Sequence, residues 1–278
     1  MQDVIEKLGK SIIQHGPYNR RVYLMKLHIQ DAHSIRSYIE CLAHNNKYEK
    51  IVAKIPSGIK RDYKEHGYAQ EAIIPEYFKN GEHAVFMAKY FSLSRKQVIE
   101  EELIQNILSM AIRRKHHSDS KKNECCLATH ICRLEDTCEM SLVFQAVFKT
   151  YPFPIFDANY LSEVIKKRQS HFFGIRKNGR IVAIAASEID LPNQAVEMTD
   201  FATLPEFRGQ GLAGCLLKDM EQSMKKKGMK TSFSIARAVS AAMNNLFAKK
   251  GYSFGGTLGN NTNIAGRIES MNVWHKRL

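Results

Sequence analysis

The sequence predicts an α+β protein made of two consecutive domains. Segments of strand-like hydrophobic alternation are interspersed with amphipathic helical segments along the whole chain, which argues against an all-helical or all-strand fold. A polar stretch without hydrophobic periodicity, residues 116–125, is the predicted linker between a first domain, 1–115, and a second domain, 126–278. The 278 residues suffice for two modest domains, and a hydrophobic content of 44% indicates packed cores rather than disorder.

The first domain, residues 1–115, has the pattern of an α/β unit. Asn80-Gly81 is a strong turn pair between its last two strands, and Gly67 is a suitable residue to end its middle helix. The predicted strands are 19–29, 47–56, 69–78 and 83–91, and the predicted helices are 33–43, 57–67 and 94–114.

The second domain, residues 126–278, predicts a mostly consecutive sheet with interspersed helices. Asn178-Gly179 marks the turn of a hairpin over 171–189, and Gly228 ends a Leu- and Met-rich helix that begins near Leu212. The other predicted strands are 128–134, 195–204, 232–238, 253–258 and 270–276, and the other predicted helices are 137–149, 157–168 and 240–250.

A short internal repeat connects the two domains. Strand, helix, His66-Gly67-Tyr68 and two strands follow one another in the first domain, and the same order occurs around Lys250-Gly251-Tyr252 in the second. Two explanations remain open: the first domain is a degenerate, partial copy of the second, or both converged on a common β-α-β-β unit.

The charge balance favours an anionic partner. Lys and Arg number 41 and Asp and Glu number 28, a net charge of +13, which suits a phosphorylated cofactor, acidic lipid or nucleic acid. No aromatic-interleaved basic patch supports nucleic acid. No apolar run approaches the roughly 18 residues of a membrane span, and the first ten residues lack an apolar signal core. We expect a cytoplasmic protein without a membrane partner.

The most informative residues form a glycine-rich turn, Arg208–Gly214, between a strand and a long helix. Glycines allow the backbone to approach a ligand closely, and the helix start offers unpaired N–H groups and a positive dipole end. This combination predicts a pyrophosphate site.

More than one cofactor could use such a turn. Gly209, Gly211 and Gly214 spell the dinucleotide pattern G-x-G-x-x-G, but residues 205–208 separate the strand from the first glycine and no carboxylate ends the next strand. A helix start without any ligand is a third reading. Arg208, Gly211 and Ala213 instead match the coenzyme A turn of the GNAT acetyltransferases, and residues 126–278 resemble a whole GNAT domain. That resemblance implies a mixed, mostly antiparallel sheet flanked by helices, acetyl-CoA as co-substrate and N-acetyltransferase activity.

Two further segments narrow the resemblance. EMTDFATLPEFRGQGLA (197–213) and NNTNIAGRIESMNVWHK (260–276) resemble the β-lysine N6-acetyltransferases, which acetylate the terminal amine of 3,6-diaminohexanoate to make a compatible solute. The implied reaction is acetyl transfer to that amine. The alternatives are another small amine (lysine, a polyamine or an aminoglycoside) or a non-catalytic module that binds coenzyme A or nucleic acid.

The resemblance also implies an acetyl-CoA site. Backbone N–H groups near Ala202 and Thr203 would stabilise the oxygen of the thioester as charge develops on it. The expected cofactor-binding residues are Phe201, Ala202, Thr203, Arg208, Gly209, Gln210, Gly211, Leu212, Ala213, Gly214, Ser240, Asn244 and Asn245.

Amine acetylation requires a base, and the strand before the turn provides Glu197 and Asp200. Residues three apart on a regular strand face opposite ways, but a bulge, which the family has at this strand, would change that. Glu197 is our first choice. Alternatively, both carboxylates only attract a cationic substrate or are solvated.

The group that would protonate the leaving thiolate departs from the family pattern. The family's usual tyrosine is replaced by Phe247, which cannot donate a proton. Either Tyr252 protonates the leaving thiolate or the thiolate leaves unprotonated.

For the amine substrate, Arg267 is the expected partner of a carboxylate, and Glu269 or Asp200 of a retained ammonium, with Asn261 and Asn263 as neutral hydrogen-bonding groups. No metal is expected, because the spacing of Cys125, Cys126, Cys132 and Cys138 matches no common zinc site. The sequence leaves open whether the chain forms a homodimer and whether the first domain is an interaction domain or part of the site.

Overall fold

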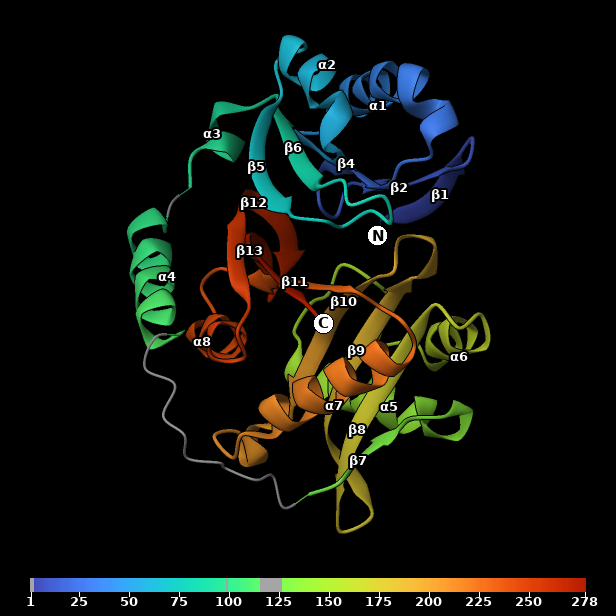
Figure 1. Cartoon of the computed structure of the whole chain (residues 1–278), viewed down its shortest axis with the longest axis vertical. Coiled ribbons are helices and arrows are strands. Elements are labelled where there is room, and N and C mark those ends of the chain that lie inside the picture. Colours follow the sequence, from blue (N-terminus) through green and yellow to red (C-terminus); the bar gives the residue numbers. More distant parts are fainter. Residues whose placement is uncertain (1–2, 99, 116–126) are drawn as a thin grey trace.

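The two predicted domains share one continuous sheet. The computed structural model describes residues 3–98, 100–115 and 127–278, and these contain a 13-stranded sheet of order β1-β2-β3-β4-β6-β5-β12-β13-β11-β10-β9-β8-β7 (Figure 1). The first six strands of this order come from the first domain and the remaining seven from the second. The predicted α+β class, with a mixed and mostly antiparallel sheet flanked by helices, is confirmed.

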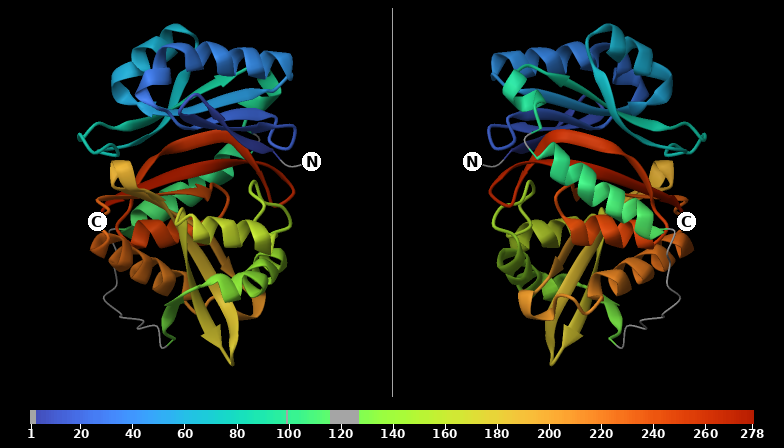
Figure 2. Two further views of the ribbon diagram at one scale, coloured as in Figure 1. Left: turned by 90° about the vertical axis from the view of Figure 1, so that its right-hand side faces the viewer. Right: turned by 90° about the vertical axis from the view of Figure 1, so that its left-hand side faces the viewer.

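Helices α1 and α2 cover the outer face of the sheet of the first domain (Figure 2). Helix α1 buries Ile35, Ile39 and Ala43, spaced four residues apart on one face. The elements of this domain are β1 (Val4–Leu8), β2 (Ser11–Gly16), β3 (Arg21–Lys26), α1 (Ala32–Asn45), β4 (Lys50–Pro56), α2 (Lys60–Glu65), β5 (Ala69–Ile74), β6 (Ala84–Tyr90) and α3 (Leu93–Lys96).

In the second domain the helix that follows the glycine-rich turn, α7, packs on β8, β9 and β10. It buries Leu212, Leu216, Leu217, Met220 and Met224, as the helical spacing predicts. The elements are α4 (Glu101–Lys115), β7 (Thr129–Ile131), α5 (Thr137–Val147), α6 (Ala158–Lys166), β8 (Ser170–Lys177), β9 (Arg180–Asp190), β10 (Ala195–Thr203), α7 (Leu212–Lys226), β11 (Thr231–Arg237), α8 (Ala241–Lys249), β12 (Ser253–Ile264) and β13 (Arg267–Arg277).

The two domains have the same topology. In the first, β3 and β4 are parallel and joined through α1, and β6 lies between β4 and β5. In the second, β10 and β11 are parallel and joined through α7, and β13 lies between β11 and β12. The antiparallel pairs β1-β2-β3 and β8-β9-β10 complete the match. The agreement extends beyond the repeat seen in the sequence and favours a degenerate copy over convergence.

The domains join through equivalent edge strands. β5 and β12 are antiparallel and pair at Ala72 and Gly256. A Cβ atom on Gly255 would lie 2.3 Å from the Ile73 carbonyl oxygen, and one on Gly256 would lie 2.1 Å from the Glu71 carbonyl oxygen. Only glycine permits backbones to approach this closely, so these two residues make the continuous sheet possible.

Three sequence predictions require correction or comment. β1 and β2 were not predicted, and the single helix expected over 94–114 is two helices. Arg95 anchors α3 to the first domain through Glu49, whereas Leu108 and Ala111 of α4 lie in the core of the second domain. Figure 2 shows α4 beside α8. The predicted linker, 116–125, lies outside the described residues.

Within the described part of the chain, no helix combines the length and the apolar character that crossing a bilayer requires.

Candidate active site

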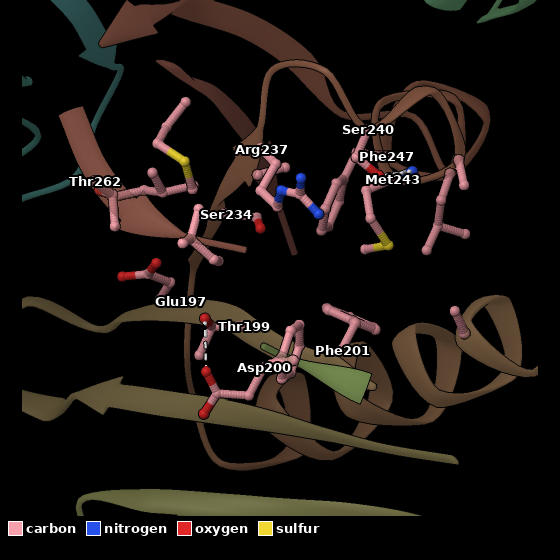
Figure 3. A pocket seen from close by; sticks show the side chains of 18 of the residues that line it. Glu197, Thr199, Asp200, Phe201, Ser234, Arg237, Ser240, Met243, Phe247 and Thr262 are labelled. Carbon is pink, nitrogen blue, oxygen red and sulfur yellow. Dashed lines mark hydrogen bonds between the residues drawn. The ribbon is translucent and has the colours of Figure 1, made fainter. Parts of the chain in front are cut away.

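A cavity of about 880 Å³ opens where two parallel strands separate. β10 and β11 pair only from Ala195 to Glu197 and from Thr231 to Phe233, and their following residues line the cavity. Figure 3 shows Glu197, Thr199 and Asp200 on one wall and residues of β11, α8 and β12 on the other. Separated strand edges leave backbone N–H and C=O groups available to a ligand.

The glycine-rich turn forms one end of this cavity. Gly209 and Gly211 have φ angles of 77° and 75°, and an added Cβ on either would meet no atom within 4 Å. No side chain caps the start of α7 at Gly211. The turn therefore presents open backbone and a free helix N-terminus, as a pyrophosphate requires. The lining residues from this segment are Arg208, Gly209, Gly211, Leu212, Ala213 and Gly214, without Gln210.

The other expected cofactor residues divide into two groups. Phe201, Thr203, Ser240 and Asn245 line the cavity, and the Asn245 Oδ1 atom is buried without a hydrogen-bond partner. Ala202 and Asn244 do not line it. The Ala202 side chain packs in the core that contains α5 and α6.

Asn244 is a structural residue instead. Its amide nitrogen donates to the backbone carbonyls of Arg237, Ala238 and Ser240. Its Oδ1 atom accepts from Asn272 at 2.8 Å and from Trp274 at 2.9 Å. All its polar atoms are therefore used to fix the start of α8 against β13.

The predicted bulge in β10 is present. Thr199 pairs with Ala186 and Ala202 with Ile184, so β10 contains one extra residue relative to β9. Asp200 lies in this bulge with a φ of 55°. The extra residue brings Glu197 and Asp200 to the same cavity, although they are three residues apart.

A third carboxyl group, which sequence reasoning missed, lies directly opposite the first. Glu188 of β9 pairs with Glu197 in the sheet register and also lines the cavity. Burial, with repulsion from Asp200, raises the pKa of Glu188 to about 7. Burial, with repulsion from Glu188, raises the pKa of Glu197 to about 8. Burial also raises the pKa of Asp200 to about 6, although hydrogen bonds from Tyr151 and Thr199 oppose the shift. Counting back along β9 and β10 from the connection between them, residues 191–194, gives this pair.

The first domain closes the opposite end of the cavity. It contributes Arg21, Tyr23, Met25, Lys26 and Lys54 to the lining. The Lys54 ammonium donates to the Tyr77 hydroxyl at 3.1 Å, and burial lowers its pKa while Asp190 and Glu197 oppose that shift. The only local signal for this role is a lysine within the otherwise apolar part of the strand KIVAKIP.

The structure places Phe247 and Tyr252 differently from each other. Phe247 lines the cavity and packs edge to face against Phe201, with ring centroids 5.8 Å apart. Tyr252 lies behind it in the core, outside the lining, and its hydroxyl bonds to Ser232 at 2.6 Å. The structure therefore gives no support to Tyr252 as a proton donor, because its side chain does not line the cavity and its ring packs against that of Phe247.

The expected substrate residues also need correction. Glu269 is buried and accepts two hydrogen bonds of 2.7 Å from Arg237, while Arg267 pairs with Glu269 and Glu100. Asn263 bonds to Tyr18 and Asn19. Of the four residues only Asn261 lines the cavity.

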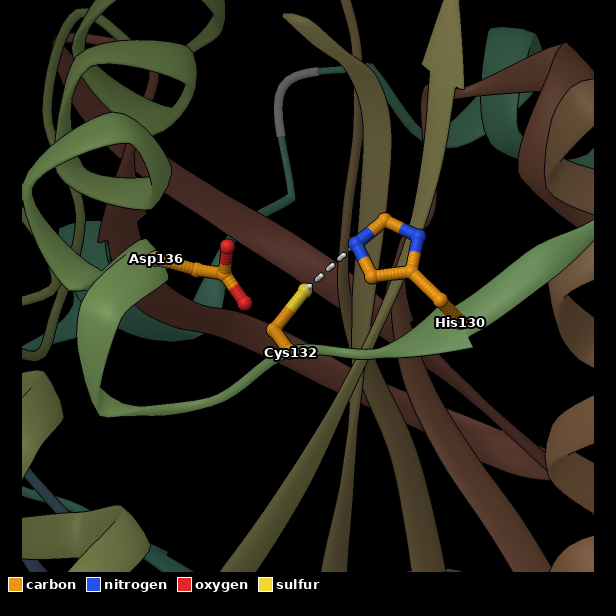
Figure 4. Close-up of side chains that lie close together, drawn as sticks. All are labelled: His130, Cys132 and Asp136. Carbon is orange, nitrogen blue, oxygen red and sulfur yellow. Dashed lines mark hydrogen bonds between the residues drawn. The ribbon is translucent and has the colours of Figure 1, made fainter. Parts of the chain in front are cut away.

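A separate cluster of three potential metal ligands lies on and after β7. His130, Cys132 and Asp136 have ligand atoms within 4.8 Å of one another (Figure 4). Both Asp136 oxygens already accept hydrogen bonds, from the Arg133 N–H and from Arg176, and burial raises the pKa of the Cys132 thiol to about 12. These contacts describe a neutral thiol in a hydrogen-bonded loop more closely than a prepared metal site.

Comparison with known proteins shows the family to which the chain belongs. The profile described as Acetyltransferase (GNAT) family matches residues 134–252. The β-lysine N(6)-acetyltransferase of Methanococcus maripaludis is 36% identical over 99% of both chains. The chain belongs to the GNAT acetyltransferase family. It is therefore an N-acetyltransferase that uses acetyl-CoA, and the glycine-rich turn lies in the matched GNAT region.

Other GNAT proteins are similar to this chain at lower identity. N-acetyltransferase YodP of Bacillus subtilis is 28% identical over 96% of both chains. Among solved structures, the ribosomal-protein-S18-alanine N-acetyltransferase of Escherichia coli is 18% identical with a TM-score of 0.48, covering 54% of this chain and 93% of that chain.

Proposed function

We propose that this GNAT enzyme transfers the acetyl group of acetyl-CoA to the terminal (N6) amine of β-lysine, giving N6-acetyl-β-lysine. The observation that carries the proposal is the cavity itself, which connects the glycine-rich turn to a cluster of three carboxyl groups. Such a cluster suits a substrate with two ammonium groups. The relative from Methanococcus maripaludis, named for this reaction, matches over nearly the full length.

The turn and the separated strands together form the acetyl-CoA site. The N–H groups of Gly209, Gly211 and the start of α7 bind the pyrophosphate, with Arg208 beside them. The extended arm of coenzyme A lies between β10 and β11, where both strand edges are unpaired. Asn245, whose Oδ1 atom has no partner, bonds to the arm from α8.

Glu197 is the general base. Its pKa of about 8 is close to the working pH, so a substantial fraction is ionised and the group can still hold a proton that it removes. Asp200 is fixed by Tyr151 and Thr199 and attracts the ammonium form of the substrate. Burial keeps the pKa of Glu197 high, and the charge of Glu188 adds to this shift.

Two features complete the reaction. Backbone N–H groups near Ala202 and Thr203, next to the bulge, stabilise the developing oxyanion. Phe247 provides no proton. The thiol of coenzyme A is acidic enough to leave as a thiolate, since the pKa of a comparable thiol, that of cysteine, is about 8.5. We propose that the enzyme works in the cytoplasm and that its product serves as a compatible solute.

The test is release of free coenzyme A thiol from acetyl-CoA with β-lysine, L-lysine, spermidine, an aminoglycoside and a lysine peptide offered separately. We expect kcat/KM for β-lysine to exceed that for spermidine at least about 100-fold, because a site built for polar groups rejects substrates that lack them. A higher kcat/KM for another amine would mean that this amine, and not β-lysine, is the substrate. No turnover with any amine, while acetyl-CoA still binds, would favour a non-catalytic module, and salt-sensitive retention on DNA would favour nucleic acid.

A further inference from the structure

Arg21 is a buried cation that lines the cavity without an anionic partner. Its side chain donates to the Asn261 backbone oxygen at 2.6 Å, to Thr262 Oγ1 at 3.0 Å and to Gln14 Oε1 at 3.2 Å. The residue is 2% exposed, and its Nε atom has no hydrogen-bond partner. Among the described residues, no carboxylate oxygen lies within 4.0 Å of its nitrogens.

The Arg21 guanidinium lacks a partner for part of its hydrogen-bonding capacity and for its charge in this position. It has five N–H donors and remains charged at neutral pH. Burial lowers the pKa of Arg21 to about 10; the Tyr23 hydroxyl and the more distant Asp3 carboxylate oppose this shift, while Arg95 adds to it. Burying an unpaired charge is unfavourable, so an anion that entered the cavity and paired with Arg21 would bind strongly.

The other basic side chains of the cavity are already occupied or differently placed. Arg237 is held by two hydrogen bonds to Glu269. The Lys54 ammonium bonds to Tyr77, and the charges of Asp190 and Glu197 favour its protonated form. Lys26 and Lys249 are exposed, and Arg208 belongs to the glycine-rich turn. Arg21 is therefore the buried cation best suited to an anion.

The surroundings of Arg21 connect it with the carboxyl cluster. Its guanidinium lies 5.2 Å from the centre of the Tyr23 ring. Burial is the main cause that raises the Tyr23 pKa, and the charge of Glu197 raises it further, so the same ring is also near Glu197. Asn261, bonded to Arg21 through its backbone, has a buried Oδ1 atom without a partner. Arg21 and Asn261 thus contribute to this wall one buried N–H donor and one buried acceptor, each without a hydrogen-bond partner.

We propose that Arg21 of the first domain binds the carboxylate of the amine substrate and that Asn261 Oδ1 accepts a hydrogen bond from the retained ammonium at the same end. This inference rests on the proposed function. A β-amino acid carries the two groups close together, and its terminal amine then extends past Tyr23 to Glu197. The first copy of the fold therefore supplies substrate specificity to the second, in the role that the sequence assigned to Arg267.

The test compares β-lysine with its neutral amide, 3,6-diaminohexanamide, on the wild type, Arg21→Gln and Arg21→Lys. We expect Arg21→Gln to raise KM for β-lysine at least about 30-fold and KM for the amide less than about 3-fold, because only the acid loses an ion pair. Arg21→Lys should restore part of the preference. The dissociation constant for acetyl-CoA serves as a folding control, because its site lies at the other end of the cavity.

The outcomes separate the inference from the proposed function. Equal losses for acid and amide would show that Arg21 only supports the structure and would overturn the inference. A wild type that acetylates neither compound would contradict the proposed function. In that case the affinities of β-lysine and of its amide are measured by calorimetry with coenzyme A present. A wild-type preference for the acid that Arg21→Gln abolishes would support the inference. A wild type without such a preference, or a preference that survives in Arg21→Gln, would overturn it.

Discussion

At the scale of single residues, the cavity is unusual because three acidic side chains line it together. Glu188 and Glu197 face each other across two strands, and Asp200 lies in the adjacent bulge. Like charges directly opposite in a sheet are unfavourable. Burial is the main cause of their raised pKa values, and repulsion between carboxylates adds to the shifts of Glu188 and Glu197. These shifts give the site a base whose ionisation falls near neutral pH.

Glu197→Gln is the variant that tests the base. Ionised Glu197 and the ammonium form of the substrate are the reacting forms, so kcat/KM of the wild type should rise with pH through about 8 and fall where the free substrate amine loses its proton. The variant should lose the first of these changes, the rise, and about 100-fold in kcat at pH 8. Initial rates from pH 6 to 10 measure both effects.

Glu188→Gln is the matched control, since it removes a neighbouring negative charge and leaves the base. Its rise should move to lower pH, because the pKa of Glu197 falls when the repulsion is removed. An unchanged pH profile in Glu197→Gln would exclude Glu197 as the base.

Which residues the sequence could predict depended on how local their signals were. The turn residues Arg208, Gly211 and Ala213 are neighbours in the chain, so their spacing could be matched to the coenzyme A turn of the GNAT family. The contact between Arg21 and Asn261 joins residues 240 positions apart, and no periodicity reports such a contact. Arg267 and Glu269 were assigned to substrate because of their residue types, but in the fold they pair with each other.

At the scale of elements, most predicted strands and helices are present because their hydrophobic periodicity was strong. β1 was missed because it is an edge strand with little burial, and β2 because a buried Gln14 interrupts its apolar pattern. α3 and α4 were joined because helical periodicity does not show that the chain leaves one domain for the other between them. The β5–β12 pair depends on Gly255 and Gly256, which sequence reasoning treated as ordinary strand residues.

Gly256→Ala tests the joint between the copies. An added Cβ would overlap the Glu71 carbonyl, so we expect the free energy of unfolding to fall by about 3 kcal/mol or more. KM for the amine should also rise, because the first domain forms that end of the cavity. Denaturant unfolding and steady-state kinetics measure the two effects.

Gly228→Ala is the control, because Gly228 also has a positive φ, 81°, but an added Cβ there meets no atom within 4 Å. Its cost should be limited to about 1–2 kcal/mol for the left-handed conformation, with KM unchanged. Equal destabilisation by the two substitutions would mean that close packing at the joint contributes little.

At the scale of the whole molecule, the two copies of the fold have different tasks. The second retains the glycine-rich turn. At the equivalent position of the first, between β3 and α1, the chain reads LHIQD without glycine, and the Asp31 carboxylate accepts hydrogen bonds from Lys10 and Ser11 there. A negative side chain at a helix start is unsuited to a phosphate. The first copy therefore has no equivalent cofactor turn, and its strands β3 and β4 instead line the cavity of the second.

The central claim is that this shared cavity orients β-lysine with its terminal amine toward the acetyl group. The most direct measurement is the reaction of β-lysine with acetyl-CoA labelled with ¹³C at the acetyl carbonyl, followed by NMR assignment of the acetylated nitrogen. We expect a single product, acetylated at N6. A product acetylated at the C3 amine, or a mixture of both, would contradict it, because the carboxylate end would then not be held away from Glu197.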